Sequence, residues 1–244
     1  MQGEEHRGRI RRLAVAAIVG QALWLAFVVV GGLIEPGYCA TRDAVSLLGA
    51  QTAAHPWAFD LAVTVWGAAF IAAALALALD GPGGLRGHLG PALIALCGVA
   101  QILVGFPFPA DCQTTIDPAC HARDLAGTLS WRHYAHGWSY FVGAAALMLS
   151  VFAMAWRFRG DRRWWRADLL ALAAGLTGIA IWTALFFGTD SSDLDANYGL
   201  QQRLTLGAAA FWIATLSAGL LYVNRDPTPL PTLDTPEGAH TRKR

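Results

Sequence analysis

Six long apolar stretches constrain the fold of this chain more than any other feature of its sequence. Each approaches the roughly 20 residues that a helix needs to cross the ~30 Å hydrocarbon core of a bilayer. None alternates strictly over segments of about ten residues, as the strands of a membrane β-barrel do. The stretches cover Leu13–Ile34, Trp57–Leu79, Gly90–Phe108, His136–Trp156, Asp168–Phe187 and Leu204–Val223. The sequence therefore predicts an all-α fold, a polytopic membrane helical bundle with six transmembrane helices.

The overall composition agrees with a membrane protein. Hydrophobic residues make up 55% of the chain and charged residues 14%, well below the roughly 25% charged residues of soluble domains. The net charge is only +1, and the basic residues are spread over separate segments, which argues against a nucleic-acid partner. We expect the lipid bilayer as partner and a lipid as a further ligand, and the sequence leaves the oligomeric state open.

Basic residues mark one side of the predicted bundle. Fourteen of the 18 Lys and Arg residues lie in the two terminal segments and in the second and fourth gaps, and four lie in the other gaps. Because basic flanks stay on the cytoplasmic side, both termini are predicted to be cytoplasmic. The predicted organisation is a basic segment over residues 1–12, a transmembrane domain over 13–223 and a disordered cytoplasmic tail over 224–244.

The predicted outer gaps are longer than the inner ones and carry three of the four cysteines. These gaps cover Glu35–Pro56, Pro109–Ala135 and Gly188–Arg203. Disulfides persist outside the cytoplasm, and Cys112 and Cys120 are close enough in sequence to close a small loop. We predict a Cys112–Cys120 disulfide, although Cys39 could pair with either of them.

Polar and ionisable side chains gather near the outer ends of the spans. Asp60, His136, Asp190 and Arg203 lie on four different spans, and Gln101 lies in the outer half of the third. Charged groups at membrane depth usually face the bundle interior, paired or in a water-filled cavity. We therefore predict one outward-facing polar pocket, in which Arg203 has Asp60 and Asp190 as possible carboxylate partners.

A short Gly-Ala-Ala motif recurs in three spans, starting at Gly67, Gly143 and Gly207. Small residues let helices in a membrane bundle approach closely. The motif therefore predicts close helix contacts at these points, whether it arose by duplication or by chance.

The outer histidines allow an enzymatic alternative. His133 and His136 can share a helix face, and with His121, Asp111 or Asp190 they could complete a zinc site. Ser46, Asp111 and His136 are weak catalytic candidates, because no nucleophile-elbow motif accompanies them. Interfacial histidines also form hydrogen bonds with no catalytic role. We expect no cofactor, with zinc as the alternative.

Several short motifs around the outer loops resemble those of one large family. They are Pro36-Gly37-Tyr38, Ser46-Leu47-Leu48-Gly49, His55-Pro56-Trp57-Ala58-Phe59-Asp60, Phe106-Pro107, Asp111-Cys112, His136 and Gly199-Leu200-Gln201-Gln202-Arg203. This pattern resembles the domain of unknown function 998 family, six-helix membrane proteins of bacteria and archaea. The family often carries Asn at the position of Asp60.

The resemblance implies a multi-pass protein of a prokaryotic plasma membrane with no established activity. It also implies a shared outer site made of Ser46, Gly49, Asp111, His136, Gln202 and Arg203. Two hypotheses follow. The first is a non-enzymatic membrane protein whose outer pocket binds a lipid or an envelope component. The alternative is a membrane-embedded lipid hydrolase or metal-dependent enzyme that uses outer His and Asp residues.

Overall fold

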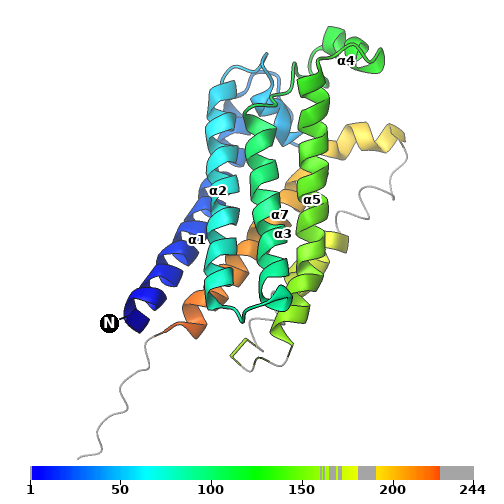
Figure 1. The fold of residues 1–244 in the computed structure, drawn as a ribbon. Coiled ribbons are helices and arrows are strands. Elements are labelled where there is room, and N and C mark those ends of the chain that lie inside the picture. Colours follow the sequence, from blue (N-terminus) through cyan, green and yellow to red (C-terminus); the bar gives the residue numbers. More distant parts are fainter. Residues whose placement is uncertain are drawn as a thin grey trace, which may run out of the picture.

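The structure is a computed structural model. It describes residues 2–159, 161, 163–164, 169, 172–180 and 191–225, of which residues 2 and 191–196 are described by their backbone alone. The described residues form an all-helical bundle (Figure 1), which confirms the predicted fold class. Its elements are α1 (Gln2–Ile34), η1 (Val45–Gly49), α2 (Pro56–Asp80), α3 (Leu85–Gly105), α4 (Pro118–Leu125), α5 (Trp131–Phe158) and α7 (Ser191–Val223). Residues 172–180 are also helical.

Five helices within the described ranges are long and apolar enough to cross a membrane: α1, α2, α3, α5 and the part of α7 from Asn197 on. Half of the predicted fifth span, Asp168–Phe187, lies outside the described residues. The six-span count, the disordered tail and the cytoplasmic location of the termini therefore stay predictions. The described ends of the chain, Gln2 and Arg225, lie at the same end of the bundle (Figure 1).

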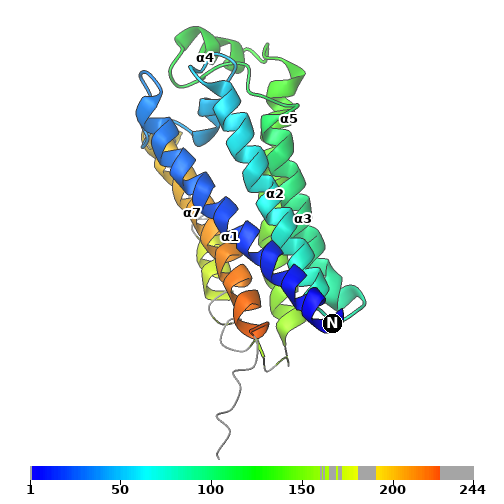
Figure 2. The same cartoon turned by 90° about the vertical axis from the view of Figure 1, so that its left-hand side faces the viewer.

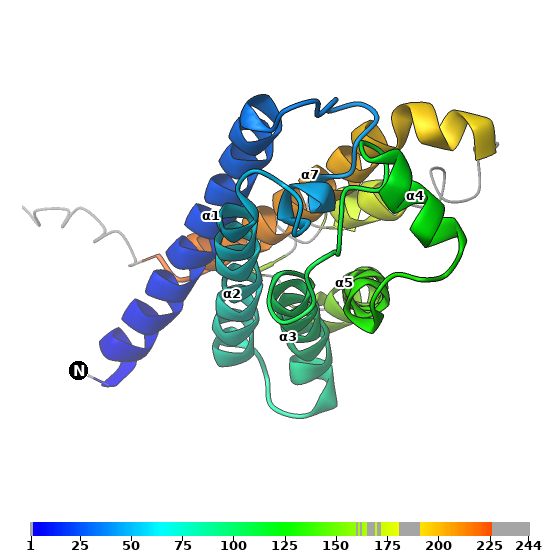
Figure 3. The same ribbon diagram turned by 90° about the horizontal axis from the view of Figure 1, so that it is seen from above.

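Consecutive helices pack side by side, α1 on α2, α2 on α3 and α3 on α5. The last helix, α7, returns to pack along α1 (Figure 2) and also contacts α2. Seen from above, its first turns project away from the bundle (Figure 3). The segments 35–55 and 106–130, which contain η1 and α4, cover the end of the bundle away from the N-terminus, and we call them the cap (Figure 1).

Aromatic packing fills the centre between α1 and α2. The rings of Trp24 and Trp66 stack at 4.5 Å between centroids, and Phe70 packs edge-on against Trp66 at 5.1 Å. The Trp66 indole donates to Gln21 Oε1 at 2.6 Å, so the polar edge of this ring has a partner inside the core. Buried indole N–H groups usually find such a partner.

Two of the three Gly-Ala-Ala motifs lie at close helix contacts. A Cβ on Gly67 of α2 would lie 2.5 Å from Gly98 O of α3, so the two backbones touch. A Cβ on Gly143 of α5 would lie 3.1 Å from the Ala100 Cβ. A Cβ on Gly207 would meet none of the described atoms within 4 Å. The sequence motif therefore marks a close contact in α2 and α5 but not in α7.

Helix α5 begins at Trp131, five residues before the predicted span. Ser130 caps this end, because its hydroxyl accepts a hydrogen bond from the His133 N–H. A serine in this position satisfies one of the N–H groups that a helix start leaves unpaired. Because the helix starts directly after this serine, His133 and His136 lie in the first two turns of α5.

Candidate functional site

Asp43 is the most enclosed carboxylate of the cap, with a side chain that is 0% exposed. It accepts hydrogen bonds from the Cys39 N–H and the Thr115 hydroxyl, both at 2.6 Å, and from Arg42 Nε at 2.7 Å. Burial would raise the pKa of this carboxyl, but the bonds from Arg42, Cys39 and Thr115 outweigh it and lower the pKa below its usual value. Asp43 thus ties the two segments of the cap together.

Arg203 lies at the junction of α7 and the first cap segment. Its guanidinium donates to the carbonyl oxygens of Ala40, Asp43 and Gly199 and to the Tyr38 hydroxyl, and it lies 5.3 Å above the Tyr38 ring. The expected pairing of Arg203 with Asp60 is not found between these two described residues. The reason is that the turn after α1 presents its carbonyl oxygens to α7. The second expected partner, Asp190, lies outside the described residues.

The Gly199–Arg203 motif, which precedes the sixth predicted span, packs its backbone against the first cap segment. The Gly199 N–H donates to Arg42 O at 3.1 Å and the Leu200 N–H to Thr41 O at 2.8 Å. A Cβ on Gly199 would lie 2.4 Å from Asp43 O, so only glycine permits this approach. Gln202 Oε1 accepts from the Val45 N–H at 2.5 Å and holds the start of η1.

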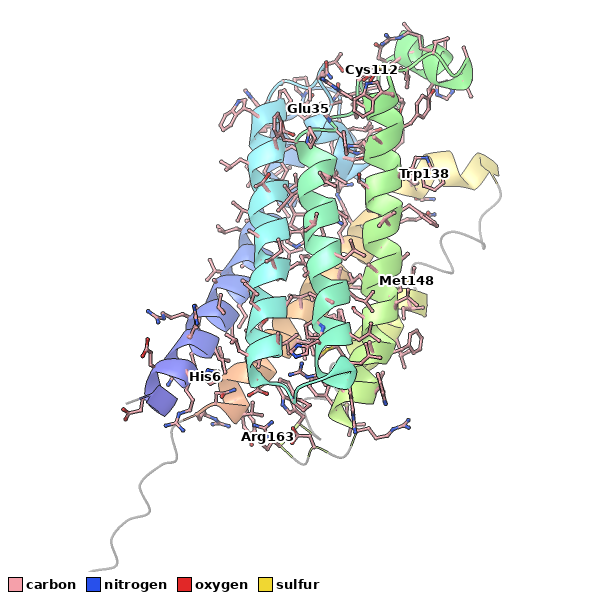
Figure 4. The ribbon with its side chains drawn as sticks, viewed as in Figure 1. His6, Glu35, Cys112, Trp138, Met148 and Arg163 are labelled. Carbon is pink, nitrogen blue, oxygen red and sulfur yellow. A yellow bond between two sulfur atoms is a disulfide. The ribbon has the colours of Figure 1, made fainter. Side chains whose placement is uncertain are left out.

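Glu35 forms a second buried link within the cap. Its carboxylate accepts from the Ala54 N–H at 3.1 Å and from the Gln113 side-chain amide at 2.9 Å. The same Gln113 amide lies 3.3 Å from Leu47 O. Figure 4 labels Glu35 and Cys112 together at the cap end of the bundle. Glu35, Asp43 and Gln113 were not predicted as site residues, and the adjacent charges Arg42-Asp43 are their only signal in the sequence.

Asp111 and His136, both predicted site residues, serve separate contacts. Asp111 accepts from the Ser130 N–H at 2.6 Å and from the Ser130 hydroxyl at 2.5 Å, and these bonds outweigh burial and lower its pKa. His136 is buried, and its Nδ1 lies 2.8 Å from Val104 O and 3.0 Å from Phe108 O. Two carbonyl acceptors require the proton on Nδ1, so His136 binds carbonyls left free where α3 ends.

The contacts within the cap bear on two kinds of chemistry, nucleophilic attack by a serine and metal binding. The Ser130 hydroxyl donates to the Asp111 carboxylate, and the described contacts do not pair it with a histidine ring. Within the described ranges, no three His, Cys, Asp or Glu side chains lie close enough to hold a metal ion. His121, His133 and His136 therefore form no ready ligand set there, and zinc stays a prediction.

The predicted disulfide is the one that the structure joins, Cys112 to Cys120. Arg123 Nη2 lies 3.0 Å from the Cys112 sulfur, so the small loop is also held by a side chain. Cys39 is exposed and free, and Cys97 is buried and free.

We expect a membrane-impermeant maleimide to label Cys39 in intact cells, because this thiol is exposed in the cap and the cap is predicted to lie outside. Labelling is read on gels as a mass shift, and Cys39→Ser should abolish it. Labelling that requires permeabilised cells would place the cap in the cytoplasm and reverse the predicted orientation.

Asp60 and Gln101 lie apart from the cap network. Asp60 sits on α2 beside Gly105 of α3, and its Oδ1 is buried with no hydrogen-bond partner among the described residues. Gln101 is buried on α3. Of the predicted pocket residues, the structure brings Gln202 and Arg203 together on the first cap segment, while Asp111 and His136 contact the second.

Two neighbouring cavities lie beneath the cap. The smaller, of about 20 Å³, reaches Ser46 of η1 and Gln202 of α7. The larger, of about 60 Å³, lies where α2, α3, α5, α7 and residues 172–180 meet. Four residues line both cavities: Trp66, Gln101, Tyr140 and Leu206. Apolar side chains form most of the larger lining, including Met148, labelled on α5 in Figure 4.

Two tryptophans that line these cavities carry hydrogen-bond donors without a described acceptor. The indole N–H groups of Trp24, in the smaller cavity, and Trp212, in the larger, are buried with no acceptor among the residues described. Trp212 Nε1 would lie 3.3 Å from a Cβ on Gly175, so it points toward residues 172–180. Buried polar atoms without a partner are rare and suggest a missing water or ligand.

Comparison with known proteins identifies one family. The family described as "Protein of unknown function (DUF998)" matches residues 18–219. This range includes the whole cap, all of α2, α3, α4 and α5, and parts of α1 and α7. No curated protein and no solved structure matches this chain.

Proposed function

This chain belongs to the DUF998 family of proteins of unknown function, and we propose that within this family it binds a lipid or a lipid-like component of the cell envelope. The ligand would enter the larger cavity beneath the cap with part of an apolar chain. The proposed site is this apolar cavity and not an open polar pocket, because the polar side chains of the cap form hydrogen bonds within the cap. Their role is to close the bundle above the cavity.

The observation that carries the proposal is the chemistry of the larger cavity. Its lining is apolar apart from a few groups such as Gln101 and Tyr140, and the unpaired Trp212 indole offers only a donor. An apolar cavity with few convergent polar groups is the usual form of a small-molecule site. A donor in such a cavity favours ligands with an ester, ether or carbonyl oxygen over ligands that only donate. A cavity of about 60 Å³ holds a segment of an alkyl or prenyl chain, not a whole lipid.

The enzymatic alternative has less support. A hydrolase of the serine–histidine type would need a serine paired with a histidine. Here the Ser130 hydroxyl donates to Asp111, and His136 Nδ1 lies against backbone carbonyl oxygens. Metal analysis of the purified protein separates the two hypotheses. Stoichiometric zinc that is lost in His136→Ala would favour the enzyme.

Filling the cavity should remove the ligand. We expect wild-type protein, extracted in mild detergent, to retain a lipid-sized adduct in native mass spectrometry. Ala144 lines the cavity, so Ala144→Phe should lose most of that adduct. Ala68 is exposed on α2, and Ala68→Phe serves as a matched control that should retain it.

Two outcomes would contradict the proposal. One is a wild-type protein that carries no adduct even when an envelope lipid extract is added. The other is equal retention by Ala144→Phe and Ala68→Phe, which would place the bound lipid on the outer surface of the bundle. The melting temperature of each variant shows whether a loss of adduct reflects the cavity or unfolding.

A further inference from the structure

A larger and more polar cavity lies at the opposite end of the bundle from the cap. It encloses about 870 Å³ between the end of α2, the turn that follows it, the start of α3 and the end of α5. Its lining includes four arginines and two aspartates among the described residues: Arg86, Arg157, Arg159, Arg163, Asp80 and Asp161. Figure 4 labels Arg163 at this end. We call it the arginine cavity.

Two of these arginines are fixed by neutral groups. Arg157 is 4% exposed and donates to Gly87 O at 2.6 Å and to Leu77 O at 2.5 Å. Arg86 donates to Trp156 O at 3.0 Å and to Arg159 O. Carbonyl oxygens satisfy the donors but carry no net charge. Both guanidinium groups therefore keep their positive charge at the cavity without a carboxylate partner in these bonds.

The two carboxylates are shared with one arginine. Arg163 lies 2.9 Å from Asp161 and 3.8 Å from Asp80. Asp80 also accepts from Asn224 at 3.0 Å and from the Trp164 indole at 3.3 Å. With four guanidinium groups and two carboxylates, the described lining carries a net positive charge. An anion is therefore the complementary ligand.

The place of the arginine cavity in the fold indicates the kind of anion. The cavity lies where α2 ends at Asp80 and α3 begins at Leu85, at the ends of two helices that are long and apolar enough to cross a membrane. The rings of Phe158 and Trp164 stack at 4.3 Å and give it an apolar wall. A basic pocket with an apolar wall between helix ends suits the headgroup of a phospholipid. A soluble anion would gain nothing from that wall.

We propose that the arginine cavity binds the phosphate group of an anionic phospholipid from the leaflet at this end of the bundle. Arg86 and Arg157 also hold helix ends together through their hydrogen bonds to backbone carbonyl oxygens. The same side chains would therefore serve both helix packing and phosphate binding. Guanidinium groups pair with phosphate oxygens through charge-assisted hydrogen bonds. This site is separate from the cavity beneath the cap, and neither depends on the other.

Gly83 offers a test that leaves every arginine in place. It lines the arginine cavity, and an added Cβ would meet nothing within 4 Å in the part of the chain that the structure describes. Gly83→Glu brings a negative charge to the cavity, and Gly83→Lys a positive one. Gly8, on α1 at the same end, has equally open surroundings among the described atoms, so Gly8→Glu is the matched control for net charge.

The measurement is native mass spectrometry of the full chain titrated with phosphatidylglycerol, with phosphatidylcholine and inorganic phosphate in parallel. Because a unit charge a few ångströms from a phosphate acts through a partly screened medium, we expect Gly83→Glu to weaken phosphatidylglycerol binding about fivefold and Gly83→Lys to strengthen it. Gly8→Glu should bind as the wild type does, and phosphatidylcholine should bind more weakly to all four proteins.

Equal affinities for Gly83→Glu, Gly83→Lys and Gly8→Glu would overturn the proposal. Inorganic phosphate that displaces phosphatidylglycerol at equal concentration would also overturn it, because the site would then take a free anion. Melting temperatures measured without added lipid show that each variant is folded, so that a change in affinity reflects the site.

Discussion

Gly67→Ala is expected to lower the melting temperature of the detergent-solubilised protein by about 5–10 °C, from an overpacking cost of about 1–3 kcal/mol. A Cβ at this position would lie 2.5 Å from Gly98 O and 2.7 Å from Ile102 Cγ1. The first of these atoms belongs to a backbone, which cannot rotate away as a side chain can. Helices α2 and α3 must therefore separate along this contact, and the aromatic packing around Trp66 moves with them.

Gly207→Ala is the control for this prediction. It makes the same chemical change in the third copy of the same motif, where an added Cβ meets no atom of the described chain within 4 Å. Alanine in place of glycine within a helix stabilises by about 0.5–1 kcal/mol when there is space for it. We expect an unchanged or slightly raised melting temperature. Equal losses in both variants would show that α2 and α3 are not in backbone contact.

Asp43→Ala is expected to destabilise the cap by about 3 kcal/mol, since it removes the buried carboxylate that accepts several charge-assisted hydrogen bonds. The donors are the Cys39 N–H, the Thr115 hydroxyl and the Arg42 guanidinium. The loss is measured as a lower melting temperature and as faster proteolysis within the two cap segments. The helices below should stay resistant, because the apolar core contributes most of their stability.

Two further variants show what the carboxylate contributes. Asp43→Asn keeps the size of the side chain but removes its charge, so it should fall between the wild type and Asp43→Ala. Asp124→Ala removes a carboxylate from α4 of the same cap, for which the structure describes no side-chain hydrogen bond, and it should change little. A cap that resists proteolysis equally in Asp43→Ala and Asp124→Ala would contradict the central role of Asp43.

The helices were predictable from the sequence because length and apolar character decide them. The predicted span Trp57–Leu79 differs from α2 by one residue at each end. The prediction starts α5 at His136, too late, because its first turn is polar and depends on the Ser130 cap rather than on hydropathy. Half of the fifth predicted span lies outside the described chain, so that span stays a prediction, although residues 172–180 within it are helical.

The site was harder to predict, because sequence gives the depth of a polar residue but not the direction of its side chain. Arg203 and Asp60 were expected to meet because both lie near the outer ends of spans. In the structure Arg203 turns to Tyr38 and to backbone carbonyls, while Asp60 lies against α3. Carbonyl partners have no signature in a sequence. The Gly199–Arg203 motif carried useful information, since the contacts of Gly199, Gln202 and Arg203 with the first cap segment depend on those residue types.

The contacts between α7 and the first cap segment also order events during synthesis. Val45 and Gln202 are 157 positions apart in the chain, and Tyr38 and Arg203 are 165 apart. The first cap segment therefore lacks the Gln202 acceptor for its Val45 N–H, and the Arg203 guanidinium for its carbonyl oxygens, until α7 has been synthesised and packed. A variant that lacks α7 would leave the first cap segment without these partners. Helix α7 thus completes a part of the fold that is synthesised long before it.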